Sequence, residues 1–305
     1  MKSHNKYFFL FITLLFIGIE SSKGQEIINK SFSEIQKLEI KSGAIEIQYE
    51  GKENAKQLDL EAFLGQEENA DKNLVMITVG NTLKIAYNGS NEHRGSKKYI
   101  KIDGPASMQL SVKSSSGSVV ISGVNAPSHQ IEASSGQVKV FDVKGDILLK
   151  ASSGNIQLAH LMGNVDCKVS SGNASIEDVR GNLNFKATSG QLKANAISGL
   201  LNAQLTSGNM KLNQIGELGQ LEITSGNIKA EHAGLGTTTS MNGSSGNIHI
   251  TTSSDLNDYN FEMRAGSGNI KVGNRSGNKS IHIQNGKSST ISGKVGSGNI
   301  SIQQL

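Results

Sequence analysis

The sequence predicts an all-β protein, a parallel β-solenoid with about 18 residues per coil that follows an N-terminal β capping region. From Gly136 to Gly208 a glycine recurs at every ninth residue. The residues between these glycines alternate between apolar and polar, which is the period of a half-buried strand. Two nine-residue strand–turn units therefore make one coil, and parallel pairing stacks such coils about 4.8 Å apart. A β-sandwich is the alternative fold, but sandwiches rarely keep so strict a period.

The composition agrees with a folded protein that is rich in turns. Glycine supplies 35 of the 305 residues and proline only 2, which excludes a collagen-like chain. Apolar residues reach 36%, which argues against disorder. The net charge is only +4, without the clusters of lysine and arginine that a nucleic-acid-binding protein needs.

Residues 1–24 have the pattern of a secretory signal peptide. Two lysines precede an apolar run from Tyr7 to Ile19, and the small residues Ser22 and Gly24 suit a cleavage site. A transmembrane helix needs about 20 apolar residues, so this run is too short to be an anchor. The sequence therefore predicts export to the periplasm, the outer surface or the extracellular space, with no membrane span after cleavage.

Residues 25–112 do not keep the nine-residue period. They contain four strand-like runs, at Leu38–Ile47, Leu74–Val79, Leu83–Tyr87 and Tyr99–Ile102. The first coil of a solenoid has an unpaired strand edge that promotes aggregation, and terminal units cover such edges. We therefore expect residues 25–112 to form an N-terminal β region that caps the stack.

Residues 113–305 form the predicted solenoid. Inward positions 18 residues apart, or 20 at the last step, are apolar: Val138, Ile156, Ala174, Leu192, Met210, Ile228 and Ile248. After Gly226 the main glycines are spaced by 20, 22 and 30 residues, with longer loops expected near 231–243, 253–265 and 273–295. The chain ends in its own repeat at Gly298–Ile302, which predicts an uncapped strand edge at that end.

The residue after each main glycine is an amide in successive coils: Gln137, Asn155, Asn173, Gln191, Asn209 and Asn227. Stacked identical amides can hydrogen-bond from one coil to the next. We therefore interpret this polar column as structural, with a binding role as the alternative.

The stretch from Ile100 to Pro105, the run Leu110–Gly123 and the Ser-Gly-Asn-Ile units after them resemble a bacterial family of adhesin domains with β-strand repeats. That family also carries the label "putative auto-transporter adhesin, head-GIN type". The resemblance implies an exported β-solenoid with an adhesin-like role, and it brings no catalytic residues to this chain.

One outward column is rich in lysine, and it reads Val120, Lys139, Gln157, Ser175, Lys193, Lys211, Lys229, His249, Lys271 and Ser301. A second, shorter run on the other strand consists of Lys150, Lys168 and Lys186. One interpretation is that these charges extend into solvent and discourage aggregation at strand edges. The other is that the first column binds an anionic polymer, such as an acidic polysaccharide or lipopolysaccharide.

No motif for a metal, a cofactor or catalysis emerges. Calcium-binding nonapeptides carry Gly-Gly-x-Gly-x-Asp, whereas this sequence has no Gly-Gly pair. The single cysteine, Cys167, excludes a disulfide framework within the chain, and it is expected to face inward as a small core residue. Three acids near one expected loop, Asp255, Asp258 and Glu262, leave a polysaccharide-active β-helix enzyme as a minor alternative.

These observations predict a non-enzymatic exported solenoid, an adhesin-like or scaffold protein of the cell envelope that presents a repetitive polar, lysine-lined surface. A periplasmic protein that binds a partner or senses the state of the envelope is the alternative. The expected partner is an anionic polysaccharide or an envelope protein, and no cofactor is expected.

Overall fold

The computed structural model describes residues 27–65, 70–89 and 98–305. The predicted signal peptide at residues 1–24 lies outside the described residues. The strands of the N-terminal part are β1 (Ile27–Ser33), β2 (Lys37–Ser42), β3 (Glu46–Lys52), β4 (Gln57–Phe63), β5 (Leu74–Val79), β6 (Thr82–Tyr87), β7 (Tyr99–Pro105), β8 (Gln109–Ser114) and β9 (Val119–Ser122). Those that follow are β10 (Asn125–Ala133), β11 (Gln137–Met162), β12 (Val165–Arg180), β13 (Leu183–Ser245), β14 (Ile248–Thr252), β15 (Asn260–Val272), β16 (Arg275–Ile283), β17 (Thr290–Ser297) and β18 (Ile300–Gln304). Short 3-10 helices lie at Ala70–Asn73 and Leu256–Asp258.

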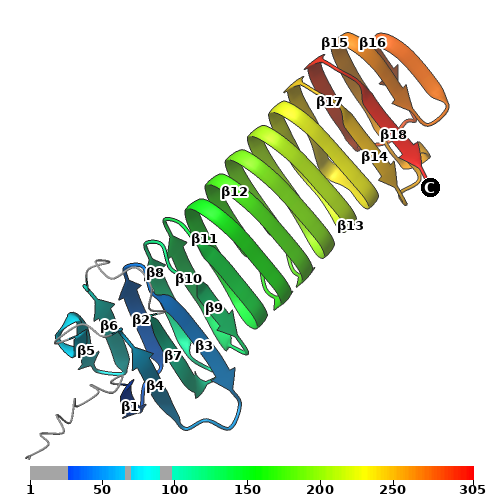
Figure 1. Ribbon diagram of the computed structural model, residues 1–305. Coiled ribbons are helices and arrows are strands. Elements are labelled where there is room, and N and C mark those ends of the chain that lie inside the picture. The colour runs from blue at the N-terminus through cyan, green and yellow to red at the C-terminus, as the bar shows by residue number, and fades with distance from the viewer. Residues whose placement is uncertain (1–26, 66–69, 90–97) are drawn as a thin grey trace, which may run out of the picture.

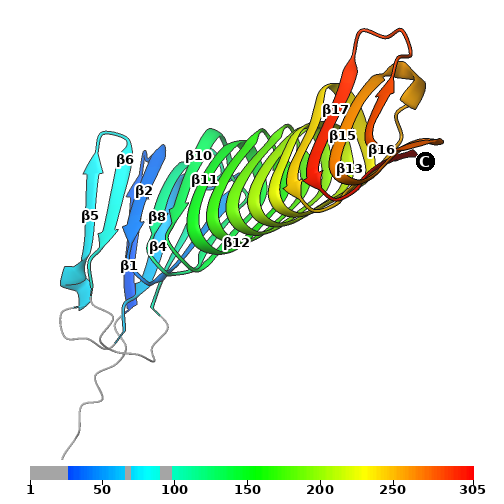
Figure 2. The same cartoon turned by 90° about the horizontal axis from the view of Figure 1, so that it is seen from above.

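The chain winds into a rod of stacked coils, as Figures 1 and 2 show. Neighbouring coils pair in parallel, so that Ile147 pairs with Val165, which pairs in turn with Leu183. Ser153 likewise pairs with Ser171 on the other side of the corner. The side chains of Asn184 and Asn202, which are 18 residues apart, are hydrogen-bonded between coils in the same register. The predicted parallel β-solenoid is therefore confirmed, with the predicted coil length.

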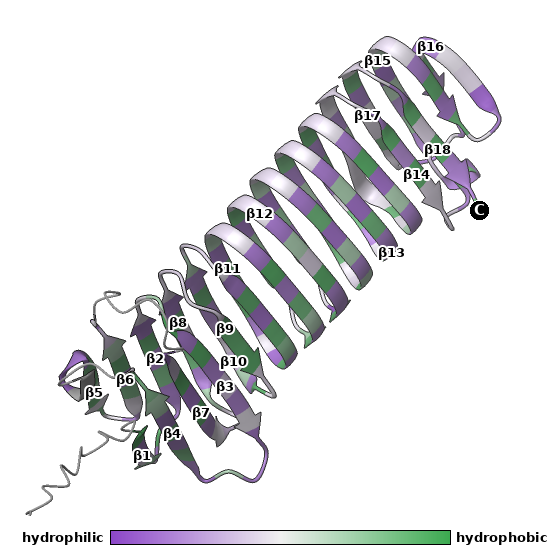
Figure 3. Ribbon diagram, in the orientation of Figure 1, coloured by the Kyte–Doolittle hydropathy of each residue, from purple (hydrophilic) through white to green (hydrophobic). Residues whose placement is uncertain are grey.

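The interior of the rod is a continuous apolar core. The coil that begins at Ile147 turns six side chains inward: Ile147, Leu149, Ala151, Ile156, Leu158 and Leu161. The inward column predicted from Val138 to Ile248 is buried at every position. Apolar and polar residues alternate along the coils in Figure 3. Each fully buried leucine or isoleucine contributes roughly 1.5–3 kcal/mol, so every added coil stabilises the stack.

Two kinds of corner close each coil. At the first, Gly154 has a φ of 120° and lies against the carbonyl oxygen of Gly136, where a Cβ atom would collide. At the second, Leu158 and Leu161 both face inward, although residues three apart in a regular strand point to opposite faces. His160 between them has a φ of 55°, and this left-handed turn returns the chain to the inward face. The same left-handed conformation recurs once per coil, at Asp142, His160, Asp178, Ala196, Gln214 and His232.

At the N-terminal end the order of strands in space differs from their order in sequence. β2 pairs in parallel with both β6 and β8, and β3 pairs with both β7 and β9. The predicted strand at Leu38–Ile47 is therefore wrong in part, because a corner at Gly43 divides it between β2 and β3. Antiparallel strands end the stack: β5 lies on β6, β4 lies on β7, and β1 lies on β4.

The C-terminal end is interleaved in the same way, and the predicted uncapped edge is wrong. β18 lies between β14 and β15, and β17 lies between the end of β13 and β15. β16 then pairs antiparallel with β15. The last coil of the chain therefore sits inside the stack, and strands occupy much of the expected loop at 273–295. The expected loop at 231–243 is wrong, because β13 runs through it, and the one at 253–265 is wrong in part, because β15 begins at Asn260. The wider spacing of the last main glycines reflects this insertion, because Gly298 stacks between Gly246 and Gly268.

Candidate functional site

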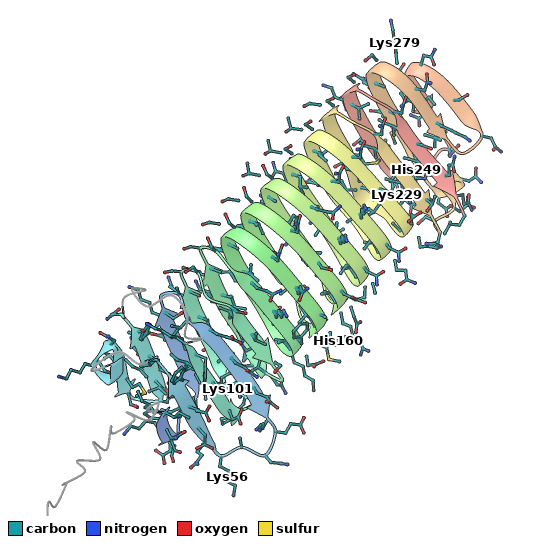
Figure 4. The ribbon with its side chains drawn as sticks, in the orientation of Figure 1. Lys56, Lys101, His160, Lys229, His249 and Lys279 are labelled. Atoms are coloured by element: carbon teal, nitrogen blue, oxygen red, sulfur yellow. The ribbon has the colours of Figure 1, made fainter. Side chains whose placement is uncertain are left out.

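The predicted lysine column is continuous only at its centre. Lys193 pairs with Ser175, and Lys229 pairs with His249, which is visible beside it in Figure 4. Gln157 and Ser175 separate Lys139 from Lys193, while His249 and Ser301 separate Lys271 from Lys229. We call the central members Lys193, Lys211 and Lys229 the central lysine column.

A shallow groove of about 420 Å³ runs beside the central lysine column. Acidic and amide side chains also line it, including Glu177, Asn213 and Glu231. Lys229 Nζ lies 2.8 Å from Glu231 Oε1, and this hydrogen bond lowers the pKa of Glu231. One of the three lysine charges is therefore partly neutralised at pH 7.

The second lysine run becomes longer in the structure than in the sequence. Register pairing places Lys41 beside Lys113, Lys113 beside Glu132, and Glu132 beside Lys150. Lys150 and Lys168 pair next, followed by Lys168 and Lys186. The six positions line one groove of about 760 Å³, which we call the lysine groove.

Sequence reasoning missed that Lys41 and Lys113 belong to this run, because β2 is interleaved between β6 and β8. A signal for Lys113 exists in the sequence. A lysine precedes a corner glycine by four residues in Lys113–Gly117, Lys150–Gly154, Lys168–Gly172 and Lys186–Gly190, with Ser or Thr at the two positions before the glycine. Lys41 lacks this spacing, because Gly43 follows it after one residue.

Three lysines of the groove have no ion pair within 4 Å among the described residues, and they are Lys41, Lys150 and Lys186, although Lys150 acts on Glu132 at longer range. Lys113 Nζ lies 2.8 Å from Glu132 Oε2, and this contact lowers the pKa of Glu132. Lys168 Nζ lies 3.6 Å from Asp166 Oδ1. The groove therefore keeps an excess of positive charge.

The amide column forms ladders in the C-terminal coils. Asn227 Nδ2 donates to Asn209 Oδ1 at 3.2 Å, and Asn247 Nδ2 donates to Asn227 Oδ1 at 3.3 Å. The ladder continues through the inserted coil, where Asn299 Nδ2 donates to Asn247 Oδ1 at 3.0 Å. These bonds support the structural interpretation of the column.

The three acids named for the enzyme alternative, Asp255, Asp258 and Glu262, each make a different local contact. The Asp255 side chain accepts a hydrogen bond from the Asn257 backbone nitrogen at 2.9 Å. Lys287 Nζ lies 3.0 Å from Asp258 Oδ1, and His282 Nδ1 lies 3.8 Å from Glu262 Oε1.

The described residues were compared with what a metal site and a reactive thiol need. Three or more His, Cys, Asp or Glu side chains gather nowhere there in a metal-binding group. The thiol of Cys167 is buried, as predicted, and this burial raises its pKa to about 12. The thiolate, which is the nucleophilic form, is therefore scarce at pH 7.

Among the described residues, no helix is long and apolar enough to span a membrane.

A family profile described as Toastrack DUF4097 matches residues 35–196 and, a second time, residues 144–303. The chain belongs to this family. The two matches overlap, and the second is the first moved along the stack, as expected for a profile that fits a run of nearly equivalent coils. The match supports the coarser resemblance to adhesin-like repeat proteins, and it does not show an auto-transporter or head-GIN type.

The chain is also similar to solved structures that carry related names. A "putative adhesin" from Parabacteroides distasonis is 15% identical, with 92% of this chain and 98% of that chain covered and a TM-score of 0.49. A "putative adhesin" from Bacteroides fragilis is 13% identical, with 91% and 97% covered and a TM-score of 0.28. A "putative lipid binding protein" from Parabacteroides distasonis is 15% identical, with 92% and 98% covered and a TM-score of 0.34. No protein of curated function matches the chain.

Proposed function

We propose that the protein is an exported, non-enzymatic, adhesin-like binding protein of the cell envelope. The observation that carries this proposal is the repetition of exposed side chains from coil to coil, with Lys193, Lys211 and Lys229 as the contiguous lysines of one column. A rod of this kind presents many weak contacts in one line, and display of several copies multiplies them into useful avidity. The separate use of Asp255, Asp258 and Glu262 in local contacts supports a non-enzymatic role.

The ligand of the central lysine column is an anionic polymer of the envelope in this proposal. Exposed unit charges attract a polyanion from solution, and salt screens that attraction over about 8 Å at physiological ionic strength. Lys139 and Lys271 lie in the same column but three strand spacings from this centre, beyond the screening length, so they contribute only where an extended polymer reaches them directly.

Retention of protein-coated beads on purified bacterial envelope tests the proposal. Replacing Lys193, Lys211 and Lys229 by glutamine is expected to lower retention and to flatten its dependence on salt. Beads coated with the unfolded protein serve as the control for nonspecific charge. Equal retention of folded wild type, folded variant and unfolded protein would remove the proposed function.

Protease treatment of intact cells addresses location separately. A surface-displayed solenoid is expected to release peptides, whereas a periplasmic one is spared until the outer membrane is opened.

A further inference from the structure

The lysine groove is a built surface with a floor and two different walls. Its floor consists of small or short residues, among them Ser114, Ala151 and Val169. The lysine row forms one wall, and a row of hydroxyl side chains forms the other: Ser115, Ser134, Ser152, Ser170, Thr188 and Thr206. Both rows run from coil to coil, so the groove follows the rod axis.

The charges in the groove repeat at the spacing of the strands. Parallel neighbours lie about 4.8 Å apart, so Lys150, Lys168 and Lys186 present three cations in a row of about 10 Å. Lys113 and Lys41 continue the row beyond Glu132. Since Glu132 is bonded to Lys113 at 2.8 Å and also accepts from Gln130 at 2.9 Å, its charge is largely satisfied within the protein. An extended polyanion matches this row, whereas a compact ion meets only one or two of the lysines.

Hydroxyl and amide groups flank the lysines on both sides. The hydroxyl wall lies on one side. The neighbouring groove on the other side shares Lys168, Lys186 and Gln204, and its lining combines the amides of Asn184, Asn202 and Gln220 with the carboxylates of Asp166 and Glu222. Hydroxyls and amides both donate and accept hydrogen bonds, which suits a ligand that carries many hydroxyl groups of its own. A polyphosphate offers acceptors only, and the forked guanidinium that pairs best with phosphate is absent from this groove.

Single-stranded nucleic acid fits the groove poorly. Such ligands bind by stacking bases on aromatic side chains, and none of the residues that line the lysine groove is aromatic.

Two buried serines at the N-terminal end of the lysine groove, Ser42 and Ser114, have Oγ atoms without a protein partner, where later coils have alanine or valine. Because these Oγ atoms are themselves shielded from solvent, the polar surface of the groove comes from its two walls.

We propose that the lysine groove binds an extended acidic polysaccharide whose sugar carboxylates meet the lysines and whose hydroxyls meet the serine and threonine wall. This inference rests on the proposed binding function, and it adds to the central lysine column a second binding face with a stated ligand class. The polymer lies along the rod, across the strands, with successive carboxylates beside successive coils.

Titration of soluble polygalacturonate into the full-length mature protein tests this inference. The variant K150Q/K168Q/K186Q is expected to bind about tenfold more weakly, because each exposed charge contact contributes up to about 1 kcal/mol. The matched control K56Q/K101Q/K279Q removes the same number of exposed charges outside both the lysine groove and the groove beside the central lysine column, and it is expected to bind within about twofold of wild type. Circular dichroism checks that both variants remain folded.

The variant S152A/S170A separates the hydroxyl wall from simple charge attraction. It is expected to weaken binding of polygalacturonate more than binding of inorganic polyphosphate, because a polyphosphate can only accept from these hydroxyls, whereas sugar hydroxyls both donate and accept. Equal losses in the two triple variants, no loss in either, or binding of polyphosphate as tight as that of polygalacturonate would overturn the inference. Retention on bacterial envelope is measured on the same samples, so intact retention without polygalacturonate binding removes the ligand assignment and leaves the proposed function standing.

Discussion

His129 is a polar exception in the core of the described residues. It is 3% exposed and pairs in register with Ile147, so an imidazole occupies a column that the next coils fill with Ile147, Val165 and Leu183. Neither ring nitrogen has a hydrogen-bond partner of good geometry. Burial lowers the pKa of His129, and nearby backbone groups of Lys144 and Ala126 oppose this shift only in part.

The protein is therefore expected to lose stability as the pH falls below about 6.5, the ordinary pKa of histidine. Below that pH the unfolded chain binds a proton at His129 that the folded chain resists, so the full stabilisation is present only above it. The variant His129→Leu is expected to remove a component of up to about 1.4 kcal/mol per pH unit from the slope of unfolding free energy.

Urea denaturation at a series of pH values between 7.5 and 5 measures that slope. His249→Gln is the control, because its side chain lies on the outward lysine column and not in the core. A His129→Leu protein with the wild-type pH dependence would show that another group controls acid stability.

Single residues also show where sequence reasoning reached its limit. The glycine corners and the inward apolar column are predictable, because each depends on one residue type at a fixed spacing. The second corner is not, because Asp142, Ala196 and Gln214 share a left-handed backbone but no chemical feature. Left-handed backbone costs such residues about 1–2 kcal/mol each, so tertiary packing and not local preference decides their conformation.

At the scale of elements, each end of the solenoid has a terminal strand that lies between two other strands of the stack. β2 and β18 are the examples, since each is bonded on both sides although each lies near one end of the described chain. Parallel pairing with distant strands leaves no local pattern in the sequence, so the interleaving was not predictable. The full length of the lysine groove was not predictable for the same reason, because the pairing of β2 with β8 is what places Lys41 beside Lys113.

The inserted position of β18 makes a definite prediction about its side chains. Ile302 is fully buried, whereas Leu305, close behind it in the chain, is 63% exposed. Ile302→Ala is expected to lower the unfolding free energy of the C-terminal coils by about 2–5 kcal/mol, the usual cost of emptying a core site. Leu305→Ala is the control, and surface changes of this kind stay within about 0.5 kcal/mol.

Hydrogen exchange of β14 and β15 amides is the appropriate measurement, because it reports on the strands that flank β18. Faster exchange in Ile302→Ala alone supports the insertion. Equal exchange in both variants would mean that β18 is an unpaired edge after all.

The whole molecule is a one-dimensional stack in which each coil contacts only its two neighbours. Stability then depends on the number of coils and on the contacts between adjacent ones. The central coils are nearly equivalent in register, as the pairing of residues 147–161 with 165–179 shows. A whole coil is therefore the natural unit of insertion or loss, and half a coil is not.

Deleting residues 183–200, one complete coil, is expected to leave a folded rod shorter by about 4.8 Å. The join places Leu201 after Asn182, so Val165 gains Leu201 as its new neighbour in place of Leu183 and the apolar column continues. Deleting only residues 183–191 joins Asn182 to Leu192. Leu192 normally pairs with Ala174 on the opposite strand of the coil, and the deletion moves it to the position of Leu183 beside Val165. That chain is expected to lose cooperative unfolding and to aggregate.

Circular dichroism, thermal unfolding and small-angle scattering distinguish the two deletions. The shorter rod should retain the strand signal of the parent and a single unfolding transition, with a maximum dimension reduced by one coil. The half-coil deletion removes fewer residues, so a model in which damage simply grows with the length removed predicts the opposite ranking. Finding that opposite ranking would show that the coils are not interchangeable units, since the register between coils would then fail to govern the stability of the rod.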